Sequence, residues 1–88
     1  MPDTPPAFNK TVLLVDDHEA VRDLFKRALA NEGILVVGAP SGTEAVTLAH
    51  KLAGESAPAL ILLDIMMPGI DGFETLRRLK SSSKTKNI

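Results

Sequence analysis

Two apolar runs in the chain each end in aspartate. Thr11–Val15 reads TVLLV and precedes Asp16 and Asp17, and Ala59–Leu63 reads ALILL and precedes Asp64. Strands of a parallel sheet that is covered on both faces are typically continuous apolar runs of this kind. The pattern therefore predicts two buried parallel strands, each followed at once by acidic residues.

The segment between these two runs carries apolar residues at helical spacing. Over 19–31 the spacing i, i+3, i+4, i+7, i+8 predicts one apolar helix face, made of Val21, Leu24, Phe25, Ala28 and Leu29. Glu32 and Gly33 follow, and glycine favours the left-handed conformation that ends many helices. Ile34–Gly38 is a short apolar run rich in β-formers, so it predicts a further strand.

Two further helices are predicted from their capping residues. Ser41–Glu44 reads SGTE, a capping box that opens a helix. The inward face of that helix consists of Ala45, Val46, Leu48, Ala49 and Leu52. Asp71 is the predicted N-cap of the last helix. This helix is expected to turn Phe73, Leu76 and Leu79 inward and Glu74, Arg77, Arg78 and Lys80 toward water.

The order β-α-β-α-β-α predicts an α/β domain. Right-handed crossovers make its sheet parallel and place helices on both faces. Residues 1–9 carry three prolines and few apolar groups, so we interpret them as a disordered tail. Residues 10–88 are predicted to form one domain, in a size range where a single hydrophobic core is only marginally sufficient.

Composition narrows the functional classes. Of the 88 residues, 44% are apolar and 24% charged, as in soluble globular proteins. The apolar runs are too short to cross a bilayer, and the chain shows neither a secretory signal nor cysteine, so we expect a cytoplasmic protein. Ten basic and eleven acidic residues give a formal charge of -1, with no basic stripe and no tyrosine or tryptophan. This composition argues against direct binding of nucleic acid.

The three aspartates after the strands are the candidate chemical site. Ligands of open α/β sheets bind beyond the carboxyl ends of the strands, where these side chains would converge. Carboxylates suit a hard cation such as Mg2+ and, through it, a phosphoryl group. Asp16 and Asp17 alone could simply cap a helix. A phosphatase of the haloacid dehalogenase type requires a second acid two residues after its nucleophile, where this chain has Met66.

Taken together, these motifs resemble the receiver domain of two-component response regulators. The match spans Lys10 to Leu79 and includes LLVDD at 13–17, EG at 32–33, SGTEA at 41–45 and LLDIMMPGIDG at 62–72. The resemblance implies a flavodoxin-like receiver fold, here cut to β-α-β-α-β-α with a three-stranded parallel sheet of order 2-1-3. It also implies a phosphorelay signalling domain rather than an enzyme.

The same resemblance implies a role for each acid. Asp64 is the expected phosphoacceptor, and Asp16 and Asp17 are the expected acidic pair that holds Mg2+ together with Asp64. The backbone carbonyl of Met66 is expected to be a further metal ligand. The expected phosphoryl donor is a histidine kinase or a phosphotransfer protein.

A complete receiver continues with a fourth and a fifth strand, which carry the hydroxyl and the lysine that contact the phosphoryl group. These 88 residues hold no counterpart, so we expect a truncated receiver with reduced or absent switching. Its third strand would be an open edge, which predicts a homodimer or a higher homo-oligomer through that edge. One alternative is a non-phosphorylated self-association or interaction module. Another is a fragment that accepts phosphoryl groups from small donors such as acetyl phosphate.

Three other side chains receive a structural interpretation. His18 is interpreted as an exposed residue at the start of the first helix, because nothing nearby in the sequence orients it. His50, in the second helix, is interpreted in the same way. Met67 is interpreted as a gap-filling side chain of the core. We therefore expect none of the three to act as a ligand.

Overall fold

Residues 9–88 form three strands that alternate with three helices. The fold is given by a computed structural model, which describes these residues. In chain order the elements are β1 (Lys10–Val15), α1 (Glu19–Ala30), β2 (Ile34–Ala39), α2 (Gly42–Leu52), β3 (Leu60–Leu63) and α3 (Gly72–Lys80). Eight of the nine residues of the predicted tail lie outside the described residues. The ninth, Asn9, donates its backbone N–H to the carbonyl of Gly33, 2.8 Å away.

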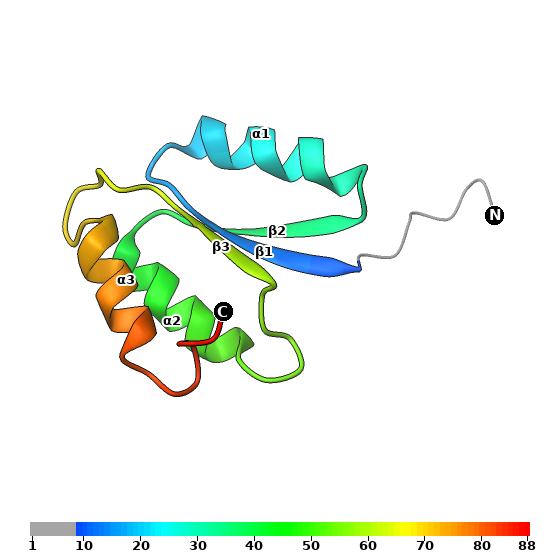
Figure 1. Cartoon of the computed structure of the whole chain (residues 1–88). Coiled ribbons are helices and arrows are strands. Elements are labelled where there is room, and N and C mark those ends of the chain that lie inside the picture. Colours follow the sequence, from blue (N-terminus) through cyan, green and yellow to red (C-terminus); the bar gives the residue numbers. More distant parts are fainter. Residues whose placement is uncertain (1–8) are drawn as a thin grey trace.

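The three strands form one parallel sheet in the order β2-β1-β3, which confirms the predicted topology (Figure 1). The central strand is β1, whose Leu13 and Val15 are fully buried. Val15 is in register with Ala39 of β2 and with Leu63 of β3. All three strands therefore end at the same edge of the sheet.

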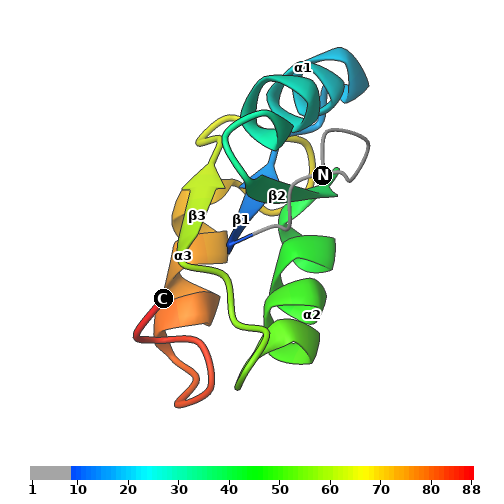
Figure 2. The ribbon, with the colours of Figure 1, turned by 90° about the vertical axis from the view of Figure 1, so that its right-hand side faces the viewer.

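The helices cover both faces of the sheet, as two views at right angles show (Figures 1 and 2). On one face α1 lies over β2, and on the other α2 and α3 lie side by side. Glycine at position 42 permits a close approach of α2 to α3, because a Cβ atom there would collide with the hydroxyl of Thr75 and with the side chain of Ile70. Thr75 is itself completely buried in this contact.

Predicted helix boundaries agree with the structure to within one residue, and the caps have the expected geometry. The Ser41 hydroxyl accepts a hydrogen bond from the backbone N–H of Glu44 at 3.2 Å. Asp71 accepts one from the backbone N–H of Glu74 at 2.8 Å. Gly33 adopts a positive φ of 74° just after α1. Each cap satisfies a backbone group that the helix itself leaves without a partner.

The predicted inward faces of α1 and α3 are only partly correct. In α1 no residue is fully buried, and Leu24 and Phe25 are 64% and 36% exposed. In α3 Leu79 is buried as predicted, but Phe73 and Leu76 are 66% and 44% exposed. A helical stripe indicates which face is apolar, whereas burial also requires an element opposite that face. Among the described residues, no strand or helix lies beyond β3 to supply one.

Residues 81–88, which show no periodicity in the sequence, form turns that fold back on the end of α3. The Thr85 side chain is buried, and its hydroxyl donates to the carbonyl of Leu79 at 2.6 Å. The Lys80 ammonium donates to the carbonyls of Lys86 and Ile88 at 2.8 and 3.2 Å. The Thr85 bond satisfies a carbonyl group in the last turn of α3, and the Lys80 bonds tie the end of the chain to this helix, with Ile88 beside β3 in the groove.

Candidate metal and phosphoryl site

The acidic residues lie where β1 and β3 end side by side. The backbone N–H of Asp16 donates to the Ala39 carbonyl at 3.1 Å, and that of Asp64 donates to the Val15 carbonyl at 3.0 Å. These two bonds extend the sheet ladder by one residue on either side of β1. They hold both aspartates at a rigid edge rather than in a free loop.

The acidic cluster consists of Asp16, Asp17, His18 and Asp64. One possible ligand atom from each of the four residues lies within 4.8 Å of the others. The three aspartates thus converge at the strand ends, as the sequence pattern indicates. His18 was not expected in this group.

His18 is oriented by the two aspartates that precede it. Its Nδ1 lies 2.9 Å from Oδ1 of Asp16 and 3.2 Å from Oδ1 of Asp17, while its backbone N–H donates to the same Asp16 oxygen at 2.8 Å. The side chain is 68% exposed. The expectation of an exposed residue is correct, but the statement that nothing orients His18 is wrong. The orienting groups are its sequence neighbours, and sequence alone does not show whether a turn brings them together.

The electrostatics of the cluster follow from these contacts. Partial burial raises the pKa of Asp16, but hydrogen bonds from the His18 backbone and ring outweigh it, so this pKa lies below its usual value. The hydrogen bond to Asp16 raises the pKa of His18, and the negative charges of Asp17 and Asp64 act in the same direction. Within the described residues, the buried Oδ1 of Asp17 has no hydrogen-bond partner. The 3.2 Å approach of His18 is a charge contact without hydrogen-bond geometry.

The loop after β3 is fixed by local contacts. Oδ1 of Asp64 accepts a hydrogen bond from the backbone N–H of Met66 at 3.1 Å. Gly72 donates its N–H to the carbonyl of Ile65 at 2.8 Å, and a Cβ atom at 72 would lie only 2.5 Å from the backbone oxygen of Asp64. Glycine is therefore required where α3 begins against the site. The Met66 side chain is 84% exposed, whereas Met67 is buried in the core as interpreted.

Sequence reasoning missed a positioning role for Arg22. Its Nη1 donates to the backbone carbonyl of Asp16 at 2.7 Å and so ties α1 to the end of β1. The Arg22 side chain packs over Gly38, where an added Cβ would lie 3.0 Å from Cδ of Arg22. An arginine on a helix gives no signal of such a bond in a single sequence. The glycine at the end of the apolar run Ile34–Gly38 was the one available hint of a close approach.

The second histidine also differs from its interpretation. His50 is half-buried, with Nδ1 2.8 Å from the carbonyl of Val46 and Nε2 3.0 Å from the hydroxyl of Ser82. It therefore links α2 to the turns after α3 and is not a freely exposed residue. Its partner Ser82 is distant in sequence, so the helical pattern of α2 could not reveal the contact.

The donor set of the acidic cluster fits a divalent cation. Mg2+ takes oxygen ligands and is usually bound through one or two carboxylates plus water and phosphate. The cluster offers three carboxylates, and the buried Asp17 oxygen without a partner is a group that a cation would satisfy. Converging carboxylates repel each other, and a bound cation removes this repulsion.

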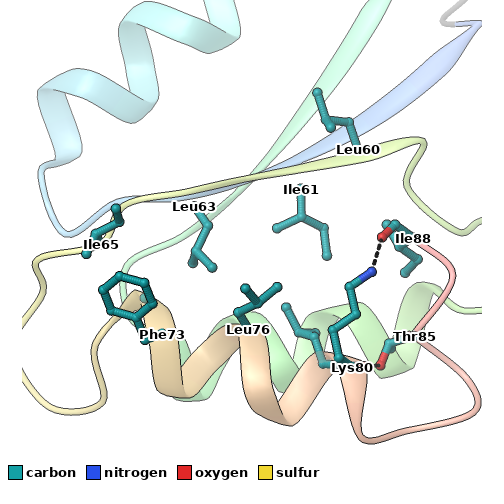
Figure 3. Close-up of a pocket in the computed structure, with 11 residues that line it drawn as sticks. Leu60, Ile61, Leu63, Ile65, Phe73, Leu76, Lys80, Thr85 and Ile88 are labelled. Carbon is teal, nitrogen blue, oxygen red and sulfur yellow. Dashed lines mark hydrogen bonds between the residues drawn. The ribbon is translucent and has the colours of Figure 1, made fainter.

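A separate apolar groove of about 430 Å³ opens between β3 and α3 (Figure 3). Its apolar lining residues are Leu60, Ile61, Leu63, Ile65, Phe73, Leu76, Leu79 and Ile88. In Figure 3 Ile61 and Leu63 point from the strand toward α3, and Phe73 and Leu76 point back toward the strand. The groove follows the free edge of β3, which pairs only with β1 among the described strands.

No helix in residues 9–88 is both long and apolar enough to span a membrane.

Comparisons with known proteins agree with this geometry. The model of the response regulator receiver domain family matches residues 12–88. The response regulator GacA of Pseudomonas viridiflava is 47% identical over 73 residues, which cover 81% of this chain and 32% of GacA. The chain therefore belongs to the response regulator receiver domain family and represents a signalling domain of two-component systems.

Solved structures of receivers have the same fold. The N-terminal domain of a response regulator receiver protein from Methanoculleus marisnigri superimposes with a TM-score of 0.82 at 38% identity, covering 91% of this chain and 62% of that one. The response regulator TrrA of Thermotoga maritima, solved in complex with Mg(2+)-BeF, gives 0.73 at 36% identity, covering 85% of this chain and 62% of that one. The chain thus spans about a third of the curated relative GacA and about three fifths of these solved receivers.

Proposed function

We propose that this receiver domain accepts a phosphoryl group on Asp64 in a Mg2+-dependent reaction. The observation that carries the proposal is the convergence of three carboxylates at the strand ends, one of them with a buried oxygen that lacks a partner. The proposed ligands are Asp16, Asp17, Asp64 and the backbone carbonyl of Met66. The similar protein TrrA was solved with Mg2+ and a beryllium fluoride group, which supports metal and phosphoryl chemistry in this family.

In the proposed reaction a carboxylate oxygen of Asp64 attacks the phosphorus of a phosphorylated donor. The new P–O bond gives an acyl phosphate as the bond from phosphorus to the donor breaks, and the leaving group keeps its electron pair. The donor is phosphohistidine of a histidine kinase or phosphotransfer protein, or a small acyl phosphate. Bound Mg2+ would screen the negative charge shared by the aspartates and the incoming phosphoryl oxygens.

The protein groups around Asp64 orient the nucleophile. The Met66 N–H holds one carboxylate oxygen at 3.1 Å, which leaves the other oxygen for attack. Asp64 follows β3 directly, and its backbone bond to Val15 keeps it at the sheet edge. Rigid placement of this kind contributes to catalysis by reducing the entropy lost on reaching the transition state.

We also propose that the 88-residue chain alone transmits phosphorylation weakly. None of the three described strands is followed directly by a lysine that could pair with the phosphoryl oxygens. A charged partner strengthens a bond to a phosphoryl group, so its absence reduces the free energy available to drive a conformational change. A full conformational response of the isolated chain to beryllofluoride, followed by NMR, would contradict this proposal.

The direct test of phosphorylation is intact-mass measurement after incubation with acetyl phosphate and Mg2+. A phosphoryl adduct is expected on the native chain, and none on Asp64→Asn. Asp23→Asn is the matched control, since Asp23 is an aspartate of α1 outside the acidic cluster. Absence of an adduct on a folded native chain, or an adduct that persists in Asp64→Asn, would refute the proposed acceptor.

A second proposal, favoured by the apolar groove, is self-association through β3. The strand is apolar on both faces: Ile61 and Leu63 face α3, and Leu62 lines a shallower apolar surface with Val21 and Phe25. A partner at this edge must itself be a short strand with two apolar faces, and β3 of a second copy has that property. Antiparallel pairing of two β3 edges about a two-fold axis would satisfy both edges at once.

Sedimentation at micromolar concentration tests this dimer. Each large apolar side chain removed from water contributes about 1.5–3 kcal/mol, so Leu76→Lys in the groove should weaken association strongly. Leu24→Lys is the control, because Leu24 is exposed on α1 and does not line the groove. A folded native chain that sediments as a monomer would exclude this interface.

A further inference from the structure

We propose that His18 Nδ1 is an additional metal ligand and makes the acidic cluster selective for imidazole-binding transition-metal dications, such as Ni2+ and Zn2+, over Mg2+. The inference rests on the metal site of the proposed function and adds to it a nitrogen donor and a preferred class of cation. It also assigns a role to a residue whose sequence pattern suggests none.

The distances within the cluster are those of ligands that share one ion. Two neighbouring ligands of an octahedral ion with bonds of 2.0–2.1 Å lie about 2.9 Å apart. His18 Nδ1 is 2.9 Å from Oδ1 of Asp16 and 3.2 Å from Oδ1 of Asp17. Once the ring turns its Nδ1 from the hydrogen bond with Asp16 toward an ion, this nitrogen and the two carboxylate oxygens would form one face of a coordination sphere.

The turn before α1 holds this face in place. His18 is the N-cap of α1, and its backbone N–H donates to the same Asp16 oxygen that contacts its ring. Asp16 is tied in turn to Arg22 through its backbone carbonyl and to Ala39 through its backbone N–H. A ligand set held by backbone bonds needs less ordering when the ion binds, which favours affinity.

The unpartnered oxygen of Asp17 is the second observation that points to a cation. This buried atom lies 3.2 Å from His18 Nδ1 without accepting a hydrogen bond from it. Leaving a buried charged oxygen without a partner is costly in free energy. An ion placed between Asp17 and His18 would satisfy the oxygen and the ring nitrogen together.

The nitrogen donor determines which cations gain. Mg2+ prefers oxygen ligands in a strict octahedron, so an imidazole adds little to its binding. Imidazole suits Zn2+, Cu2+ and Ni2+, and affinities of mixed nitrogen and oxygen sites rise toward the end of the first transition row. If His18 acted only as a charge partner of the aspartates, it would instead compete with every cation that enters the cluster.

The test is calorimetric titration of the 88-residue chain with Ni2+ and, separately, with Mg2+ at one fixed pH. His18→Ala should reduce the affinity for Ni2+ by roughly tenfold or more, since even outer-shell partners of metal ligands change affinity about 10- to 100-fold. Its affinity for Mg2+ should be unchanged or higher. His50→Gln is the matched control, because His50 lies in α2 and bonds to Val46 and Ser82.

A second measurement identifies the binding atom. In an NMR spectrum that detects ring nitrogens, Zn2+ should shift Nδ1 of His18 and leave both nitrogens of His50 in place. This readout does not depend on phosphorylation, and His18 is exposed enough that its replacement leaves the core intact.

The outcomes separate this inference from the proposed function. Equal Ni2+ affinity of the native chain and His18→Ala, with Mg2+ still bound, would overturn the ligand role of His18 and leave the phosphoacceptor site standing. A matching loss of Ni2+ affinity in His50→Gln would also overturn it, because the nitrogen ligand would lie elsewhere. Absence of binding by any divalent cation would refute both the inference and the metal site beneath it.

Discussion

The acidic cluster lies at the carboxyl end of β3 and the apolar groove follows the free edge of this strand, and the two regions differ in how complete they are. In the acidic cluster most polar groups find partners within a few residues in sequence, such as His18 on Asp16 and Met66 on Asp64. In the groove Phe73 and Leu76 remain largely exposed. The difference shows that short loops can satisfy the polar groups of a site locally, whereas burial of an apolar face depends on elements far away in the chain.

The helix α3 joins the two regions. Its first residue, Gly72, touches the backbone of Asp64, and its last turn carries Leu79, which is buried in the core and also lines the groove. Substitutions along this one helix can therefore act mainly on the acidic cluster, on side chains buried in the monomer, or on the exposed wall of the groove.

The largest effect is expected for Leu79→Ala. Leu79 is 3% exposed within the core cluster, and truncation of a buried leucine costs about 2–5 kcal/mol in the free energy of unfolding. Leu76, one turn away, is 44% exposed, so Leu76→Ala should change the free energy of unfolding of the monomer by no more than about 0.5 kcal/mol. Urea unfolding at low protein concentration measures both.

Raising the protein concentration sharpens the same comparison. If a second copy covers the groove, the loss of unfolding free energy caused by Leu76→Ala should grow with protein concentration. The loss caused by Leu79→Ala should stay constant, because Leu79 is already buried in the monomer. Equal and large costs for both variants in dilute solution would mean that the groove is closed in the monomer, contrary to the structure.

The parts of the fold that the sequence predicted are those governed by local rules. The N-caps Ser41 and Asp71, the apolar strands and their parallel order follow from spacing, turn chemistry and the receiver resemblance, and the structure confirms them. The convergence of the aspartates follows as well, because parallel strands end at one edge. Their proposed roles as phosphoacceptor and metal ligands remain predictions.

The features that the sequence did not predict depend on contacts between distant residues or on side-chain direction. Arg22 bonds to a carbonyl across a turn, His50 reaches Ser82 over 32 positions, and Thr85 is buried against Leu79 in a segment without periodicity. A hydrophobic stripe also carries no information about its partner, so Phe73 was wrongly placed in the core. In each case the missing information is three-dimensional.

The next effect concerns the contact between α3 and the acidic cluster. Gly72→Ala would place a Cβ 2.5 Å from the Asp64 backbone oxygen, and relief of such a clash costs about 1–3 kcal/mol of stability. Because the movement displaces Asp64, the affinity for Mg2+ should fall as well. Urea unfolding and magnesium titration followed by NMR measure the two quantities.

Gly54→Ala is the control for this substitution. Gly54 has a φ of +93° and nothing within 4 Å of an added Cβ, so alanine there adds only backbone strain of about 1–2 kcal/mol. Its affinity for Mg2+ should equal that of the native chain. If Gly72→Ala binds Mg2+ as tightly as Gly54→Ala does, the start of α3 does not position the site.

A smaller effect is expected for Asp71→Ala, which removes the N-cap of α3. Loss of the bond from Asp71 to the Glu74 N–H should cost about 0.5–2 kcal/mol of stability. Asp71→Ser keeps a capping oxygen and should recover most of the loss, which distinguishes capping from the charge of Asp71. Thermal unfolding of the two variants is the measurement, and equal melting temperatures would rule out a capping role.

The smallest effect is expected on the outer, water-facing side of α3. A hydrogen bond from Arg77, together with the charges of Arg77 and Arg78, lowers the pKa of Glu74 below its usual 4.5. A lowered pKa means that the ionised form is favoured by folding, so this contribution to stability is present above the usual pKa and disappears as the pH falls through the lowered value. Arg77→Gln should therefore raise the pKa of Glu74.

The stability difference between the native chain and Arg77→Gln should be small at neutral pH, because the pair is exposed to solvent. It should vanish once the pH lies below the pKa of Glu74, as urea unfolding across that range would show. Arg27→Gln is the control, since Arg27 is exposed near the end of α1 and makes no ion pair within residues 9–88. A stability difference between the native chain and Arg77→Gln that persists in acid would mean that Arg77 stabilises α3 by packing. The outer face of α3 would then depend on apolar contacts, as the groove does, and not on charge, as the acidic cluster does.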